Sequence, residues 1–487
     1  MSVSFNGIPS NLMTPGVYFE FDNAYASANN PAFKMLAFGQ KLTAGTAADN
    51  IPLNVTSVEQ SKTWFGDGSM IARMCQAMLS ANQHIDLWAI PVSDGSTVKA
   101  VGSLKYTTNA SHNGVLNIKI GGDIVKVVVT QGDTPAQVAT ATAAAVQANG
   151  SLLVSAAVDG SDNTKTNLTA KNGGALGNDI AVSAYFAASI APTAPTLTIV
   201  QPTGGSGSPT LTSAISAMAD VWYNWIAFPY NDATSLTAIE AELLDRWGPM
   251  RQIGGRAFTA YRGNHTDTAT FGNGRNSLHV VAMGANESPQ PPYLWSATLA
   301  AVASKLLSID PARPLQTALL PGIQSPAHAS RWTQPERNTL LQDGISTFKS
   351  NVDDTVSIER IVTMYQTNDS GFEDDSYQDI QTLETLERIR FEQRAYIAST
   401  YPRHKLADDG TDYPPGQAIV TPSIIKGELI SLYQRFIDLG WVEDLAGYTS
   451  SLIVEINSSD ANRMDVRDVP NIINQFRVLA GKTQFKR

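Results

Sequence analysis

Two separate parts of the chain, before residue 95 and after residue 210, alternate short apolar runs with segments of helical period. The apolar runs have the length and character of strands that are buried on both faces. They lie at 33–39, 85–92, 222–228, 256–261 and 278–283. The helical segments lie at 58–65, 69–82, 236–247 and 294–307. This alternation predicts one α/β core domain with a mostly parallel sheet, built from residues 31–95 and 210–365.

The segment between these parts has a different pattern and composition. From Ala89 to Val221 there is no Trp, Arg or Glu. Alternating apolar positions predict strands, and Thr134 followed by Pro135 predicts the start of a helix. The predicted strands are 115–120, 124–129, 152–158 and 167–170, the helix runs from 134 to 149, and the Pro- and Gly-rich stretch 191–209 is interpreted as a linker. Residues 96–209 are therefore predicted to be a small α+β domain inserted into the core.

The last part of the chain changes character again. Apolar positions at three-residue steps predict a charged amphipathic helix over 374–398. Pro422 begins, and Gly440 ends, a second predicted helix over 423–439. Strand-like pieces follow at 451–457, 463–469 and 473–485. Residues 366–470 are thus predicted to form an α+β C-terminal domain.

Both ends of the chain have the alternation of strands. Val17, Phe19 and Phe21 fall on one face of the N-terminal segment, and Tyr18 and Glu20 fall on the other. We interpret residues 1–30 and 471–487 as extended arms. A terminal strand either folds back onto its own chain or pairs with an edge in another chain, and the residues alone do not decide between the two. The candidate inter-subunit arm residues are Val17, Tyr18, Phe19, Glu20, Phe21, Phe476, Arg477, Val478 and Leu479.

Composition narrows the possible partners. Charged residues make up 16% of the chain, whereas about 25% is usual in soluble proteins. A surface with fewer solvated charges opposes contact between molecules less, so this composition favours association. The net charge of -10 argues against direct binding of nucleic acid, which requires a basic face. Cys75 is the single cysteine, so no internal disulfide can form. The chain has no apolar run of membrane-spanning length and begins without a signal-like segment, so we expect no membrane insertion and assembly in a cytosol.

The sequence predicts neither catalysis nor a cofactor or metal site. It contains no Gly-x-Ser-x-Gly elbow, no His-Glu-x-x-His and no Gly-x-Gly-x-x-Gly. Weak candidates are the pair His265 and Asp267, the acidic loop 408–412 and a partial phosphate-loop string at 479–483. A hydrolase using the α/β core is the enzymatic alternative, and labelling of one serine by a fluorophosphonate would support it.

Several strings, in the same order along the whole chain, resemble the contractile tail sheath proteins of Mu-like bacteriophages. They are TPGVY at 14–18, LWAIPV at 87–92, GDTPAQVA at 132–139, GGALGNDI at 173–180, LLQDGI at 340–345, RAYIASTYPRHKLADDG at 394–410 and NQFRV at 474–478. The resemblance implies a core of subtilisin-like topology without a protease site, an outward-facing insert, and a C-terminal domain.

The resemblance also implies a mechanism and partners. Strands 17–22 and 476–485 would be lent to neighbouring subunits, and strands within 451–469 would receive them. The helix 423–439 would face an inner tail tube, with Lys426, Glu428 and Arg435 as candidate contacts. The subunit would form a helical stack of rings, six subunits per ring, bounded by baseplate and tail terminator proteins. Contraction of this virion sheath would drive the tube through the host envelope for DNA ejection. A sheath of a related injection or secretion system is the structural alternative.

Overall fold

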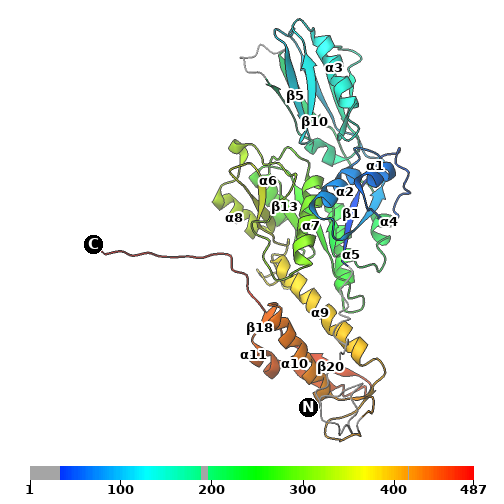
Figure 1. The fold of residues 1–487 in the computed structure, drawn as a ribbon, viewed down its shortest axis with the longest axis vertical. Coiled ribbons are helices and arrows are strands. Elements are labelled where there is room, and N and C mark those ends of the chain that lie inside the picture. The colour runs from blue at the N-terminus through cyan, green and yellow to red at the C-terminus, as the bar shows by residue number, and fades with distance from the viewer. Residues whose placement is uncertain (1–32, 188–195, 415, 487) are drawn as a thin grey trace, which may run out of the picture.

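The computed structural model describes residues 33–187, 196–414 and 416–486. The predicted N-terminal arm, with Val17, Tyr18, Phe19, Glu20 and Phe21, lies outside the described residues. The remainder is elongated, with three units following one another along the long axis (Figure 1). We refer to them as the core sheet unit in the middle, the β4–β10 unit above it and the α9–β21 unit below it.

The core sheet unit is built on one eight-stranded sheet in the order β15-β14-β13-β12-β11-β1-β3-β2. The strands from β3 to β14 pair in parallel, and the edge strands β2 and β15 are antiparallel. This confirms the predicted mixed α/β architecture. The strands are β1 (Lys34–Gln40), β2 (Leu53–Asn54), β3 (Asp86–Val92), β11 (Trp225–Ala227), β12 (Arg256–Tyr261), β13 (Val280–Gly284), β14 (Ile345–Ser350) and β15 (Val356–Arg360).

Helices cover this sheet, and one of them is almost entirely buried. Helix α7 begins with Pro292 and carries no charged residue before Lys305, so it can be enclosed on all sides. It packs on α2, β11 and β12. The helices of the unit are α1 (Val58–Phe65), α2 (Met70–Ala81), α4 (Thr212–Ser216), α5 (Ala233–Trp247), α6 (His265–Asn273), α7 (Pro292–Leu307), η2 (His328–Ser330) and α8 (Gln334–Gln342).

The β4–β10 unit consists of two sheets, ordered β10-β4-β8-β7 and β6-β5-β9, with helix α3 packed against strands of both. Thr134 caps α3 in a capping box with Gln137, as the Thr-Pro start predicts. The elements are β4 (Val101–Tyr106), β5 (Gly114–Ile120), β6 (Asp123–Val129), α3 (Pro135–Gln147), β7 (Val154–Val158), β8 (Lys165–Ala170), η1 (Ala175–Asp179), β9 (Val182–Ala187) and β10 (Leu197–Thr203).

One prediction for this unit is wrong. The stretch 191–209, interpreted from its composition as a linker, contains β10, which pairs antiparallel with β4. Its local sequence is rich in Thr, Pro and Gly, and its strand conformation depends on hydrogen bonds to a segment about 90 residues earlier. Because β4 enters the unit and β10 leaves it, their pairing closes the unit at its base.

The α9–β21 unit has a small hydrophobic core of its own. Tyr433 stacks on Tyr448 at 3.7 Å between ring centroids, and Phe436 stacks on Trp441. Helix α9 runs from the core sheet unit down into this unit (Figure 1). The elements are α9 (Ile380–Thr400), β16 (Lys405–Leu406), β17 (Ile419–Val420), α10 (Pro422–Asp438), β18 (Val442–Glu443), α11 (Leu445–Ser451), β19 (Ile453–Ile456), β20 (Met464–Arg467) and β21 (Asn471–Ile472).

Candidate functional site

The candidate site begins with a small hairpin in the α9–β21 unit. Strands β19 and β20 pair antiparallel as a two-stranded sheet, and helix α10 packs against β19. Within the described residues, the outer edges of both strands have no strand partner. Ile453 and Val466 on these strands are 41% and 47% exposed. The hairpin lies in the predicted receiving region 451–469 and offers unpaired backbone groups to an added strand.

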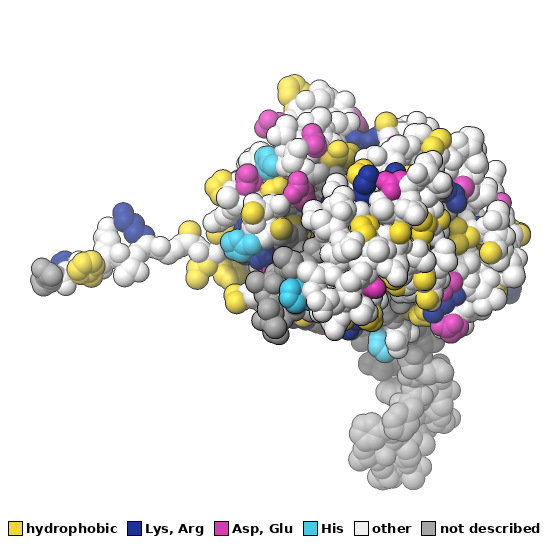
Figure 2. Space-filling model, turned by 90° about the horizontal axis from the view of Figure 1, so that it is seen from above, with side chains coloured by type: hydrophobic (Ala, Val, Ile, Leu, Met, Phe, Trp, Pro, Cys, Tyr) yellow, Lys and Arg dark blue, Asp and Glu magenta, His cyan; other side chains and the backbone are white. Residues whose placement is uncertain are grey.

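The C-terminal tail leaves the body of the molecule (Figure 1). The prediction of a strand over 476–485 is wrong for the single chain, because strand β21 ends at Ile472 and no regular structure follows it. A strand needs a hydrogen-bonding neighbour, and none of the described strands pairs with this segment. Figure 2 shows the tail extending away from the body with hydrophobic and basic side chains along it. The tail's large apolar residues, 73–85% exposed, are Phe476, Val478, Leu479 and Phe485.

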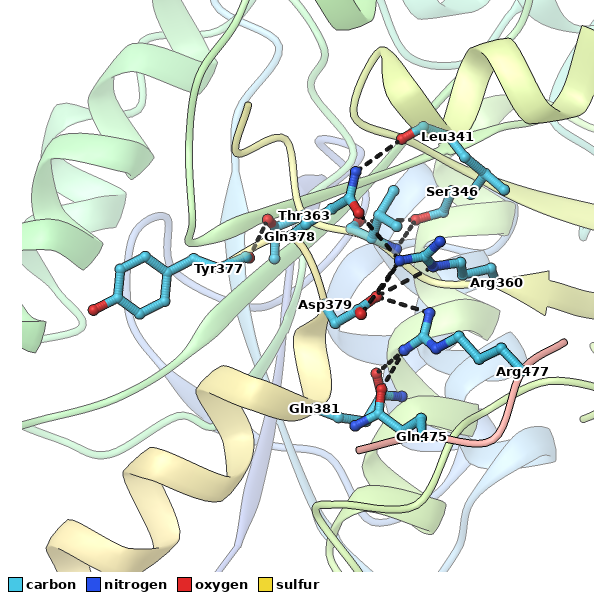
Figure 3. Close-up of polar contacts among 11 residues, drawn as sticks. Leu341, Ser346, Arg360, Thr363, Tyr377, Gln378, Asp379, Gln381, Gln475 and Arg477 are labelled. Atoms are coloured by element: carbon cyan, nitrogen blue, oxygen red, sulfur yellow. Dashed lines mark hydrogen bonds and ion pairs between the residues drawn. The ribbon is translucent and has the colours of Figure 1, made fainter. Parts of the chain in front are cut away.

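Arg477 differs from its neighbours in the tail. Its guanidinium forms an ion pair with the Asp379 carboxylate, with 2.8 Å between Nη1 and Oδ1 (Figure 3). Arg360 pairs with the same carboxylate at 3.0 Å. The Gln316 side-chain amide donates to the carbonyl oxygen of Phe476 at 3.4 Å. No local sequence pattern predicts these partners, because Asp379 and Gln316 lie about 100 and 160 residues before the tail.

The predicted tube-facing residues of α10 point in different directions. Glu428 accepts hydrogen bonds from the hydroxyls of Tyr396, at 2.5 Å, and Tyr401, at 2.8 Å, so its carboxylate is turned toward α9 and the loop after it. Arg435 is exposed and lies 3.7 Å from Glu392 of α9, and Lys426 is half-buried. The outward stripe of the helix carries two charged residues, and its exposed positions are Ser423, Ile424, Gly427, Ser431, Gln434, Arg435 and Asp438.

A groove of about 730 Å³ lies between α9, α10 and the hairpin. Its lining is largely apolar, with Ile397, Leu429 and Met464 among the contributing side chains. Arg390 and Arg394 lie at its polar side. The groove borders strand β20 and gives the side chains of an added strand an apolar surface.

Helix α9 is attached to the core sheet unit by buried charged residues and one tryptophan. We call this group the helix junction and define it as Arg256, Glu384, Glu387 and Trp222. Arg256 on β12 is fully buried, and its Nη2 lies 3.2 Å from Oε2 of Glu387. The Trp222 indole donates to the other Glu387 oxygen at 3.0 Å. Glu384 lies 3.8 Å from Arg256, and its burial raises the pKa of the Glu384 carboxyl.

The β4–β10 unit is fixed by what we call the insert junction, defined as Gln40, Asp94, Asn172 and Gly173. The Asp94 carboxylate accepts hydrogen bonds from the side-chain amides of Gln40 and Asn172, both at 2.8 Å, and from the Gly173 N–H at 2.9 Å. The Asn172 side-chain oxygen accepts the N–H of Met70, the first residue of α2, at 2.8 Å. A side chain of the β4–β10 unit thus caps a helix of the core sheet unit.

The weak chemical candidates have structural roles. The His265 ring packs edge-on against Trp332, and its Nε2 lies 3.1 Å from a backbone carbonyl oxygen. Asp409 in the acidic loop accepts from the N–H and hydroxyl of Ser423 near the start of α10. Residues 479–483 lie in the extended tail. Burial raises the pKa of the Cys75 thiol.

The described residues contain no group of three or more His, Cys, Asp or Glu side chains placed to hold a metal ion. None of the helices in the described ranges is both long and apolar enough to cross a membrane.

Comparison with known proteins gives consistent results. The model of the phage tail sheath protein central domain matches residues 204–364, and that of the phage tail sheath C-terminal domain matches residues 373–486. The chain is 39% identical over 489 residues to the Mu-like prophage FluMu tail sheath protein of Haemophilus influenzae, with full coverage of both chains. This confirms the resemblance seen in the sequence.

Solved structures similar to the chain include two sheath proteins. The sheath tail protein from Desulfitobacterium hafniense has 12% identity and a TM-score of 0.49, over 94% of this chain and 100% of that one. The contracted helical sheath of the anti-feeding prophage has 10% identity and a TM-score of 0.49, over 97% and 99%. On the strength of the matched domains and the full-length relative, the chain belongs to the phage tail sheath protein family.

Proposed function

We propose that this chain polymerises into a helical contractile sheath in which each subunit lends its terminal arms to the hairpins of its neighbours. The chain is a structural protein of the virion and not an enzyme, as its family membership indicates. The proposal rests on two complementary observations, a tail that lacks a strand partner and a hairpin whose outer edges are unpaired, both among the described residues. The tail exposes large apolar side chains and has no strand partner in the described part of the chain, and the β19–β20 hairpin has two open edges there.

Strand exchange between copies explains both observations, because the tail of one subunit would pair with the open hairpin edge of another. The tail of one subunit would gain hydrogen bonds from the hairpin of the next, and its apolar side chains would gain a surface such as the groove beside β20. The N-terminal arm, with Val17, Phe19 and Phe21 on one face, would add in the same way. A contact between different surfaces of identical subunits generates a ring when its rotation closes and a helical assembly when it does not, and the proposed arm exchange is of the second kind.

The remaining parts have roles in the proposal. The core sheet unit would correspond to residues 31–95 and 210–365 with subtilisin-like topology, the outward insert to 96–209, and the C-terminal domain to 366–470. The outward stripe of α10 would face an inner tail tube. Rings of six subunits would stack between baseplate and terminator proteins. Contraction would repack the subunits into a state with more buried contact, and the free-energy difference would drive the tube.

The test is polymerisation of arm-deleted proteins. We expect the full chain to form tubes visible by negative-stain electron microscopy at high protein concentration. Deletion of residues 1–23, or of residues 478–487, should leave a folded subunit that forms no connected tube. Circular dichroism and size-exclusion chromatography check that each truncated subunit is folded. Normal tubes from both deletions would overturn the proposal.

A further inference from the structure

We propose that Asp379 anchors the root of the C-terminal arm to its own subunit, so that the chain leaves the body only after Arg477. This inference rests on the proposed exchange of arms and deepens it by naming the point where an arm begins. The exchanged segment is then 478–487. It is shorter than the whole C-terminal stretch 471–487, which the sequence marks as an arm.

The burial pattern at the end of the chain marks this point. From Ile473 to Arg477 the backbone is extended, and the odd-numbered residues Ile473, Gln475 and Arg477 are partly buried while the even-numbered ones are exposed. A period of two is the pattern of an extended chain with one face on a surface. From Val478 to Lys486 every residue is exposed. The side chain of Arg477 is only 18% exposed and is the last one to contact the body.

The Arg477 guanidinium contacts one carboxylate and two side-chain amide oxygens (Figure 3). Nη1 lies 2.8 Å from the Asp379 Oδ1, and Nη2 donates to the side-chain oxygen of Gln381 at 3.4 Å. Gln475 accepts a further hydrogen bond from the same guanidinium. Paired and partly desolvated guanidinium–carboxylate contacts are stronger than exposed ones, because less water competes for the charges.

Asp379 also joins the arm to two other elements. It is the residue immediately before helix α9, and Arg360 at the end of β15 donates to it from Nε at 3.2 Å and Nη2 at 3.0 Å. The carboxylate therefore links the edge of the core sheet, the start of α9 and the arm. Without its negative charge, Arg360 and Arg477 would lie close together with no counter-charge between them.

This arrangement separates the hairpin that receives strands from the root that lends one. Tension on a lent arm would pass through Arg477 into the edge of the core sheet and α9. The hairpin β19–β20 of the same subunit would remain free of this load. The segment 478–485 spans roughly 27 Å when extended, at about 3.4 Å per residue.

Limited trypsin digestion of the unassembled full-length protein tests the anchor, because the end of the chain offers cleavage sites after Arg477, Lys482 and Lys486. Cleavage after Lys482 reports on the free segment, and cleavage after Arg477 requires the anchor to open. In the unaltered protein we expect cleavage after Arg477 to be at least tenfold slower than after Lys482. In Asp379→Asn, which keeps the shape of the side chain but removes its charge, the difference should fall to threefold or less.

Matched variants distinguish loss of the Arg477–Asp379 contact from unfolding of the subunit. Arg463→Gln removes an exposed ion pair with Asp465 elsewhere in the unit and should leave the cleavage ratio unchanged. If Asp379→Asn unfolds the subunit, fragments cut at buried Arg246 and Arg256 will appear. Arg360→Gln, which leaves the Arg477 pair in place, then serves as the second variant and should preserve slow cleavage after Arg477.

The outcomes distinguish the anchor from arm exchange itself. Equal cleavage rates after Arg477 and Lys482 in the unaltered protein, or an unchanged ratio in folded Asp379→Asn, would overturn the anchor. Loss of slow cleavage in Arg360→Gln would also contradict it. Tube formation by the chain truncated after Arg477 would overturn exchange of this arm, whatever the digestion shows.

Discussion

The insert junction and the helix junction both attach a unit to the core sheet unit, but with different chemistry. At the insert junction one carboxylate, Asp94, receives three neutral N–H donors. At the helix junction a fully buried guanidinium, Arg256, faces two carboxylates on α9. A hydrogen bond from a neutral donor to a carboxylate contributes about 1.5–3 kcal/mol, whereas a buried guanidinium that loses its partner costs about 3–5 kcal/mol. We therefore expect the two attachments to fail differently.

The helix junction also restricts backbone geometry. A Cβ built on Gly254 would lie 1.7 Å from the carboxylate of Glu387, so α9 approaches the core backbone closely. The guanidinium carbons of Arg256 and Arg390 lie 5.1 and 4.2 Å from the centroid of the Trp247 ring. Fixed geometry of this kind suits a subunit in which the arm root and the core sheet must move together.

The largest effect is expected from Glu387→Ala. The substitution leaves Arg256 buried without its nearest partner and removes the acceptor of the Trp222 indole, so we expect a loss of about 3–5 kcal/mol in the free energy of unfolding. Urea unfolding followed by tryptophan fluorescence measures it. The matched control is Glu384→Gln, whose cost should stay below about 1.5 kcal/mol because burial already favours the neutral carboxyl there. Equal losses in the two variants would contradict this account of the junction.

A smaller and more local effect is expected at the insert junction. Asp94→Ala removes the acceptor of three donors, so the free energy of unfolding should fall by about 2–3 kcal/mol. Hydrogen exchange of the Gly173 and Met70 amides should accelerate while the amides of β12 stay protected. Ser93→Ala, at an exposed neighbouring position, is the control. Acceleration throughout the core sheet unit would show that the insert junction is not a separate attachment.

A pH effect is expected at Asp179, which contacts Arg262 of the core sheet unit at 4.0 Å. Burial raises the pKa of Asp179 to about 6. Its carboxyl therefore binds more protons in the folded chain than in the unfolded one, so its contribution to stability falls as pH rises from about 4 to 6. The side chain is 25% exposed, which limits the effect to about 1–2 kcal/mol.

Comparison with Asp179→Asn isolates this titration from that of other groups. The stability of the unaltered protein relative to the variant should decline between pH 4 and pH 7.5. A relative stability that rises over this interval would reverse the sign and contradict the assigned burial.

The smallest effect is expected away from both junctions. Thr134→Ala removes the cap of α3 and should cost about 1 kcal/mol. Exchange of the Gly173 amide should not change, because the cap does not contact the insert junction. Thr140→Ala, at an exposed position inside the same helix, controls for loss of a threonine. Faster exchange at Gly173 in Thr134→Ala would show that α3 and the junction are coupled.

Elements whose signals are local could be predicted from the amino-acid sequence alone. The strand 256–261 and the helix 58–65 have the predicted bounds, because a buried apolar run and a serine cap each act within a few residues. The absence of Trp, Arg and Glu from Ala89 to Val221 also marks the β4–β10 unit, because composition can be read from the sequence without knowledge of the fold. The family resemblance also came from short strings kept in order along the chain.

Features that depend on residues far apart in the sequence are seen only in the folded chain. Strand β10 is hidden in a polar, Pro-rich stretch because its identity comes from pairing with β4. The tail over 476–485 has a strand-like sequence but no strand partner within residues 33–187, 196–414 and 416–486. Glu428, a candidate for contact outside the chain, is held by two tyrosine hydroxyls. The Arg477–Asp379 pair joins residues about 100 positions apart, and no periodicity encodes such a meeting, because hydrogen bonds and ion pairs form between groups that the folded chain brings together.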